Sequence, residues 1–337
     1  MANGCGADRA EACGRLMVGA TAGKRRFLTG NGFFGSDWAP FSPLGVDASR
    51  RTGAAFIGGG ALARAHRQQD RRFVVAQVNA DDFRVNGEKR AFWVATGLLV
   101  LLLVPLLPVW PVILLVIGAA AFWTWVAQGN HLGNGVKVSE KQFSEIYALC
   151  KQAAARLSMS MPQVFIVQDK TLGAFAKGFL GKKCVTLNST LVQEMTPEEL
   201  SFIIGHEFAH IKCNHTNLLV LTSAQGVSGV PGLSQALHLL YQFWSRKGEY
   251  TCDRGGLLAC RNEGAAVSAL AKLVVGTELF KQLDIEEFLG QHMDIEQDEV
   301  AKLSEVFGTH PFLLRRIKAI AEFHDSDQYR RLAAIVA

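Results

Sequence analysis

The stretch TPEELSFIIGHEFAHIKCNH, Thr196–His215, decides the fold that we expect for this chain of 337 residues. It begins with a strong helix start, because Thr196 can cap the first turn, proline occupies the first helical position and Glu199 the third. Apolar residues crowd the segment that follows, which is typical of a helix buried in a core. The sequence therefore predicts a capped, largely buried helix that begins at Pro197.

Three polar side chains interrupt this apolar helix: His206, Glu207 and His210. Residues four apart lie one turn above each other, so the two imidazoles converge on one point. Glu207 can reach a water on the same ion without being a ligand, and this HExxH pattern indicates two zinc ligands and a general base. The alternative is a surface helix with two solvated histidines. The apolar neighbours argue against it: Phe202, Ile203, Ile204 and Phe208.

A catalytic zinc usually takes three protein ligands and a water, so a third ligand must come from elsewhere in the chain. Glu249, which lies 39 residues beyond His210, is the best candidate. Asp253 follows four residues later and shares a helix face with it, so that Asp253 can accept the other ring N–H of a histidine ligand. His215 and Glu263 stay open as alternatives for the third ligand.

The segments around this helix predict a small β-sheet and further helices. Ser139 and Gln142 have the spacing of a capping box and predict a helix to about Leu157. The pattern as a whole predicts an α+β domain, mainly helical with a small β-sheet, over 139–325, followed by a C-terminal tail at 326–337. Three short strands are expected at 164–168, 172–177 and 183–188.

An uncharged apolar run precedes this domain, because no Asp, Glu, Lys or Arg occurs between Arg90 and Lys137. Its apolar part would be about 54 Å long as one helix, whereas a bilayer core is about 30 Å thick. The prolines at 105, 108 and 111 break the run. We therefore expect a transmembrane helical hairpin over 91–128 with cytoplasmic flanks, because basic residues stand at both ends. A buried hairpin in a soluble core is the alternative.

Composition bounds the remaining segments. Residues 1–90 hold 14 Lys and Arg against 8 Asp and Glu, a charge of +6 within a net charge of +5, so the rest of the chain sums to −1 and indicates no nucleic-acid partner. Seven scattered cysteines without a CxxC pair predict no disulfide framework and a reducing compartment. We expect a flexible arginine- and glycine-rich arm at 1–70 and a juxtamembrane connector at 71–90, with a short strand pair at 71–86 as the alternative. The uncharged segment 213–245 predicts a lid or interfacial element, with a second membrane hairpin as the alternative.

Three motifs together carry a family resemblance. GHEFAHIKCNH, EYTCDR at Glu249–Arg254 and THPFLLRRI at Thr309–Ile317 resemble the HtpX-type membrane zinc metalloproteases, which are gluzincins related to the CAAX prenyl endopeptidases. The resemblance covers about Ser139–Asp325 and implies a zincin-type metalloprotease domain. It also implies residue roles: a base, Glu207; an orienting carboxylate, Asp253; and three metal ligands, His206, His210 and Glu249.

Two further positions follow from the resemblance. Arg316 matches the arginine of the family's THPxxxxRI segment, for which a structural role is implied. The family's Asn-Ala-Phe-Ala edge strand, which pairs with substrate backbone, reads Gly173, Ala174, Phe175 and Ala176 here. Glycine keeps the backbone donors but lacks the amide side chain, which bears on substrate affinity rather than on zinc binding.

The expected function is that of a membrane-anchored endopeptidase with one Zn²⁺ per chain, acting on membrane or misfolded proteins. It would be an integral protein of a bacterial inner or plasma membrane with a cytoplasmic catalytic domain, whose partners are protein or peptide substrates and the lipid bilayer. One alternative is a prenyl-protein (CAAX-type) endopeptidase, which would need more membrane spans. Another is a non-catalytic scaffold with a structural zinc, which would have no need of Glu207. An oxyanion donor is also required, and His310 could supply it, but ahead of Pro311 this residue fits a helix N-cap at least as well, so we leave it outside the catalytic set.

Overall fold

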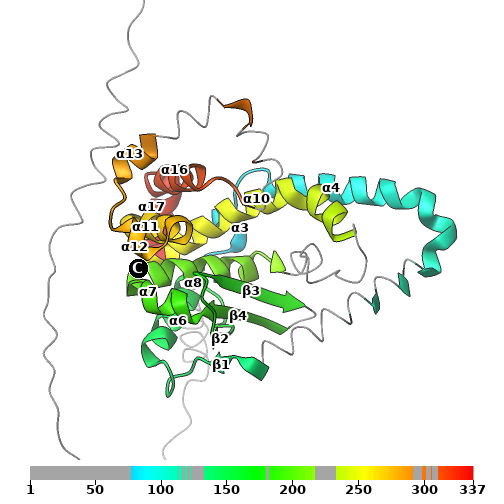
Figure 1. Cartoon of the computed structure of the whole chain (residues 1–337). Coiled ribbons are helices and arrows are strands. Elements are labelled where there is room, and N and C mark those ends of the chain that lie inside the picture. The colour runs from blue at the N-terminus through cyan, green and yellow to red at the C-terminus, as the bar shows by residue number, and fades with distance from the viewer. Residues whose placement is uncertain are drawn as a thin grey trace, which may run out of the picture. The chain divides into compact units, whose positions relative to one another are not determined.

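In the computed structural model, two helices lie side by side at the centre of the fold: α8 (Pro197–Lys212) and α10 (Leu233–Cys260) (Figure 1). The predicted start of α8 is confirmed, and it forms a capping box: Thr196 Oγ1 accepts from the Glu199 amide and the Glu199 carboxylate accepts from the Thr196 amide. Every residue of α8 from Glu199 to Ile211 is buried. The helix that the sequence singles out is therefore the central helix of the core.

The structure describes part of the chain. The predicted arm at 1–70 lies outside the described residues, and so do most of the second half of the predicted hairpin and positions 217–232 of the predicted lid. The described residues are 77–112, 114–115, 118–119, 122, 133–179, 182–216, 233–290, 298–300, 305 and 310–336.

A small mixed sheet lies beside α8. Its strands are β1 (Val136–Lys137), β2 (Gln163–Val167), β3 (Ala174–Phe179) and β4 (Lys182–Asn188), in the order β1-β2-β4-β3. β2 and β4 run parallel, whereas β1 pairs antiparallel with β2 and β3 antiparallel with β4. The three expected strands are present, although β3 starts two residues later than predicted. β3 lies at an edge of the sheet and packs against α8, which places a strand edge next to the HExxH helix.

Shorter helices complete the described domain, which is mainly helical with a small sheet. α16 (Leu313–His324) packs against both α10 and α11 (Glu263–Val275). The segment predicted as a tail forms α17 (Asp327–Ile335), and Tyr329 and Leu332 on it are buried. The remaining helices are α6 (Ser144–Arg156), α7 (Ser189–Glu194), α12 (Thr277–Phe280) and α13 (Ile285–Gly290).

The predicted start of α6 is wrong. The helix begins at Ser144 after Phe143, which has a φ of 61° and makes no side-chain cap. Ser139 and Gln142 instead form an isolated β-bridge with two backbone hydrogen bonds. A Ser and a Gln three residues apart suit a tight β-turn as well as a capping box, because backbone groups close the turn and the side chains are not needed.

The segment before the domain is helical, and a strand pair at 71–86 is not found among its described residues. α3 (Ala80–Phe83) buries Phe83 completely, and α4 (Glu88–Leu103) follows it. The helix tightens into a 3₁₀ turn, η2 (Val104–Val109), where the prolines begin, as expected for a proline break. Among the described residues no helix combines the length and the apolarity needed to cross a bilayer.

Candidate functional site

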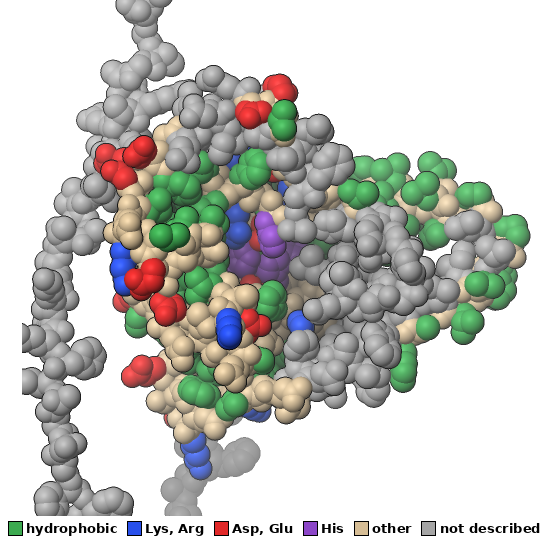
Figure 2. All heavy atoms as spheres, viewed as in Figure 1, with side chains coloured by type: hydrophobic (Ala, Val, Ile, Leu, Met, Phe, Trp, Pro, Cys, Tyr) green, Lys and Arg blue, Asp and Glu red, His purple; other side chains and the backbone are tan. Residues whose placement is uncertain are grey.

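Helix α8 brings the three HExxH side chains into the interior. His206, Glu207 and His210 are 8%, 8% and 6% exposed, and the Nε2 atoms of the two histidines lie 3.2 Å apart. Figure 2 shows histidine side chains at the centre of one face, set back between the surrounding side chains. Helical spacing thus places both imidazoles at one point, with one edge of the cluster open to a face of the domain.

Helix α10 supplies the carboxylates. Glu249 Oε2 lies 3.6 Å from His206 Nε2, and Glu249 Oε1 lies 3.5 Å from His210 Nε2. One turn further along α10, Asp253 Oδ1 lies 3.0 Å from His206 Nδ1. The continuous helix α10 therefore places both acidic residues on the face that packs against the histidines.

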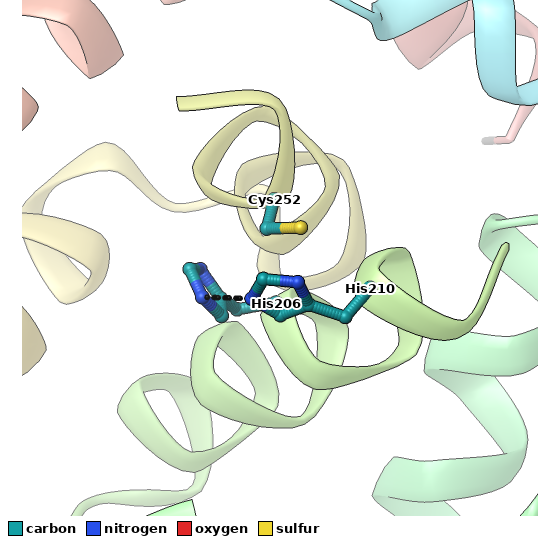
Figure 3. A group of neighbouring side chains, drawn as sticks. All are labelled: His206, His210 and Cys252. Atoms are coloured by element: carbon teal, nitrogen blue, oxygen red, sulfur yellow. Dashed lines mark hydrogen bonds between the residues drawn. The ribbon is translucent and has the colours of Figure 1, made fainter. Parts of the chain in front are cut away.

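The tautomers of the neutral histidines follow from these contacts. His206 donates its Nδ1–H to Asp253, so its Nε2 carries a lone pair. His215 Nε2 lies 2.9 Å from Glu88 and donates to it, so His215 Nδ1 is the acceptor for His210 Nδ1–H at 3.2 Å. His210 Nε2 then also carries a lone pair. With these tautomers the 3.2 Å contact between the two Nε2 atoms, dashed in Figure 3, carries no proton. Two lone pairs and the Glu249 carboxylate therefore converge on one buried point, an arrangement that favours a cation.

The spacing of these atoms fits a tetrahedral metal. Zinc–nitrogen bonds of about 2.0–2.1 Å in a tetrahedron put the ligand atoms about 3.3 Å apart. The two Nε2 atoms lie 3.2 Å apart, and one Glu249 oxygen lies 3.6 Å from His206 Nε2 while the other lies 3.5 Å from His210 Nε2. The donor set of two imidazoles and a carboxylate is also one that zinc commonly uses. The residues present therefore fit a zinc ion.

Cys252 offers a second way to complete the metal site. His206, His210 and Cys252 each have a ligand atom within 4.8 Å of the others (Figure 3). Burial together with neighbouring acidic groups raises the pKa of the Cys252 thiol well above its ordinary value, so a metal bound here would itself have to displace the thiol proton. The Cys252 sulfur also lies 3.5 Å from His215 Nδ1, the nitrogen that accepts from His210. The two oxygens of Glu249 face the two Nε2 atoms, so Glu249 and Cys252 are both candidates for the third ligand.

Helix α16 and the residues before it contact the two carboxylates of α10. Arg316 binds Asp253 through Nε at 2.8 Å and Nη2 at 2.6 Å. Burial alone would raise the pKa of Asp253, but this guanidinium and the His206 ring hold it below its ordinary value. His310 Nδ1 lies 3.1 Å from Glu249 Oε2, and this contact raises the pKa of His310. The predicted N-cap role of His310 is wrong, because Phe312 caps α16.

The edge strand β3 meets the site through Glu207. The Ala176 amide donates to Glu207 Oε2 at 2.5 Å, so this N–H points away from β4. In an antiparallel pair, the backbone N–H and C=O groups of successive residues point alternately toward and away from the partner strand. The backbone groups of Ala174 and Gly178 therefore also point away from β4, whereas Gly173 O accepts from the Asn188 backbone amide of β4. A Cβ on Gly173 would lie 2.9 Å from Asn188 Nδ2, so the buried Asn188 side chain occupies the space beside this glycine.

The alternative third ligands lie elsewhere. His215 faces His210 Nδ1, on the opposite side of that ring from the metal-facing nitrogen. Glu263 begins α11 and pairs with His324 at 3.2 Å. Sequence reasoning did not single out Cys252 or Glu88 for the site. Cys252 could have been found from its position three residues after Glu249, but a contact between Glu88 and His215, 127 residues apart, has no local signal.

Comparison with known proteins agrees with this geometry. The model of Peptidase family M48 matches residues 140–324. The plastoglobule-localized metallopeptidase 48 of Arabidopsis thaliana is 28% identical over 222 residues, which cover 60% of this chain and 63% of that protein. A Protease HtpX homolog of Bacteroides fragilis is 24% identical over 227 residues, which cover 55% of this chain and 70% of the relative. No solved structure matches the chain significantly. The chain therefore belongs to peptidase family M48, a family of metal-dependent peptidases.

Proposed function

We propose that the protein is a zinc-dependent endopeptidase that holds one ion per chain between His206, His210 and Glu249. The observation that carries this proposal is the convergence of three acceptor groups on one buried point, with Glu207 one residue from the first histidine. A purely structural zinc would be closed by four protein ligands and would need no base beside it. The presence of Glu207 therefore favours a catalytic ion.

The chain's own residues have separate tasks in this reaction. Zinc, when bound, polarises the scissile carbonyl and lowers the pKa of its water. Glu207 accepts the proton of that water and later delivers it to the leaving amine. The Ala176 N–H holds one oxygen of Glu207, which fixes the direction of the carboxylate. Asp253, clamped by Arg316, keeps His206 in the tautomer whose Nε2 is free to bind.

The outer edge of β3 is the proposed substrate cradle. A peptide lying antiparallel to β3 would pair with the outward backbone groups of Ala174 and Gly178 and extend the sheet by one strand. This edge adjoins Glu207, so a paired substrate places its backbone next to the base. Phe175 is 51% exposed and can contact a substrate side chain. Gly173, which precedes the strand, pairs with Asn188 on the inner side and shapes this edge.

We also propose that α4 begins a membrane hairpin that extends over 91–128, partly beyond the described residues, with the catalytic domain on the cytoplasmic side. The support is the exposure of large apolar side chains on α4, where Trp93, Leu101 and Leu102 are 68%, 66% and 63% exposed. Contiguous apolar surface of this kind marks a contact with lipid or protein. Reporter fusions after residues 79 and 138 should both report the cytoplasm. Opposite signals would mean a single kinked span.

Cleavage of an unstructured protein such as casein by the detergent-solubilised chain tests the function. Activity should be lost with a chelator and return with zinc. Glu207→Gln should keep wild-type zinc content but lose at least about 100-fold in turnover, because an amide cannot accept the water's proton. If Glu207→Gln kept more than about a tenth of wild-type activity, Glu207 would not be the general base.

A further inference from the structure

A buried carboxylate outside the proposed metal site stands at the beginning of α4. Glu88 is 0% exposed, although the helix that it starts is apolar and widely exposed further on. Its oxygens contact three donors: Arg84, Thr251 and His215. Burial alone would raise the pKa of Glu88, but the hydrogen bonds from His215 and Thr251 and the charge of Arg84 hold it below its ordinary value. The mechanism described above makes no use of this charge.

His215 connects Glu88 to the metal site. Its Nε2 lies 2.9 Å from Glu88 Oε1, and its Nδ1 lies 3.2 Å from His210 Nδ1. The ring is 1% exposed and packs edge-on against Trp244, with centroids 5.5 Å apart. A Cβ on Gly248 would lie 3.3 Å from the ring, so α10 passes closely over it. The imidazole therefore has little freedom to turn.

The order of hydrogen bonds in this chain has one consistent assignment for neutral rings. The carboxylate of Glu88 accepts only, so His215 Nε2 must carry the proton. His215 Nδ1 is then an acceptor, and His210 Nδ1 must donate to it. This fixes the tautomer of His210 with a lone pair on Nε2, the nitrogen that faces His206 and Glu249. Asp253 fixes His206 in the same way from the other side.

We infer that His215 and Glu88 are positioning residues that orient the metal ligand His210, and that they tie the first residue of α4 to the metal centre. The inference rests on the proposed zinc site. A carboxylate behind a histidine ligand usually sets the ring's tautomer and raises its basicity. Here the Glu88 carboxylate acts on His210 indirectly, through the imidazole of His215. Because Ala91 and Ala95 of α4 also pack on Trp244 of α10, the start of α4 and the His215 pocket form one packed unit.

The test measures zinc affinity of the full-length, detergent-solubilised chain by competition with a chromophoric chelator. Glu88→Ala removes the end of the chain of hydrogen bonds. His215→Phe keeps an aromatic ring against Trp244 but cannot accept from His210. Each should weaken zinc binding by about 10–100-fold, as is usual for groups that orient a ligand. Because both act through one connection, the double variant should lose no more than the weaker-binding single variant.

Glu199→Ala is the matched control. Glu199 is a buried carboxylate at the start of α8 that is bound by Ser268 and Lys272 rather than by the histidines. Its loss should lower thermal stability and leave zinc affinity within about threefold of wild type. If Glu88→Ala fails to fold, Glu88→Leu keeps most of the size of the side chain but offers His215 no acceptor, and zinc binding should still weaken.

Two outcomes would overturn the inference. One is zinc affinity within about threefold of wild type in folded Glu88 and His215 variants. The other is an additive loss in the double variant, which would show that the two residues act separately. A wild-type chain that binds no zinc would instead refute the proposed function on which the inference rests.

Discussion

Replacing Gly205 by alanine should separate the two helices that build the metal site. Gly205 lies on α8, where α10 crosses most closely: an added Cβ would lie 2.2 Å from Ala259 Cβ and 3.1 Å from Gly256 Cα. Ordinary carbon contacts are about 3.5–4.0 Å, so the helices must move apart by about 1 Å or more. Both neighbours are backbone or Cβ atoms, which cannot turn away as the end of a flexible side chain can.

The expected effect is larger on the site than on stability. Overpacking costs about 1–3 kcal/mol, of which the better helix propensity of alanine offsets about 1 kcal/mol. The oxygens of Glu249 on α10 now lie 3.5–3.6 Å from the histidine nitrogens. The same shift would carry them well beyond the separation of about 3.3 Å that two ligand atoms of one zinc ion require. A displacement of about 1 Å costs on the order of 100-fold in rate. Zinc affinity should fall with it, while Gly205→Ala still folds.

The assay compares zinc affinity, turnover and thermal unfolding of Gly205→Ala with those of Gly264→Ala. Gly264 lies near the start of α11, where an added Cβ would make an ordinary 3.5 Å contact with Asn262. The control should therefore match wild type in zinc affinity and turnover. A folded Gly205→Ala variant with wild-type zinc affinity and turnover would refute the argument that the close crossing sets the metal site.

Three further predictions concern the site and its surroundings. Glu249→Ala should lose both zinc and activity because a two-histidine site binds zinc poorly, whereas Cys252→Ala should keep both; metal analysis that gives the reverse pattern would make the thiolate the third ligand. Asp253→Ala should weaken zinc affinity or activity by about 10–100-fold, and a chelator titration with unchanged affinity would contradict its orienting role. Glu199 has a lowered folded-state pKa, because Lys272 and other donors outweigh its burial. The stability that ionised Glu199 adds to the folded protein is therefore fully present above the pKa of about 4.3 of an unfolded glutamate. It is lost as the pH falls through the lower pKa of Glu199 in the folded protein. Unfolding of Glu199→Ala should accordingly show a shallower decline in stability below about pH 4 than wild type.

Local rules account for most of what the sequence predicts well. Thr196 and Glu199 lie three residues apart and form the capping box of α8 with no help from the rest of the fold. The expected strands appear for a similar reason, because alternation and turn residues act over a few positions. The capping box predicted at Ser139 fails because a short polar motif fits both a helix cap and a β-turn, and the surrounding chain selects between them.

The sequence by itself determined what lies within one helix. His206 and His210 converge because 3.6 residues make a turn, and Glu249 and Asp253 share a face of α10 for the same reason. It could not decide which face of α10 meets α8. The tertiary structure placed the face with Glu249 and Asp253 against the histidines, because missing side chains at the Gly205 crossing let the helices approach. It also brought Glu88 to His215, because buried donors must find acceptors wherever packing provides them, whatever the distance along the chain.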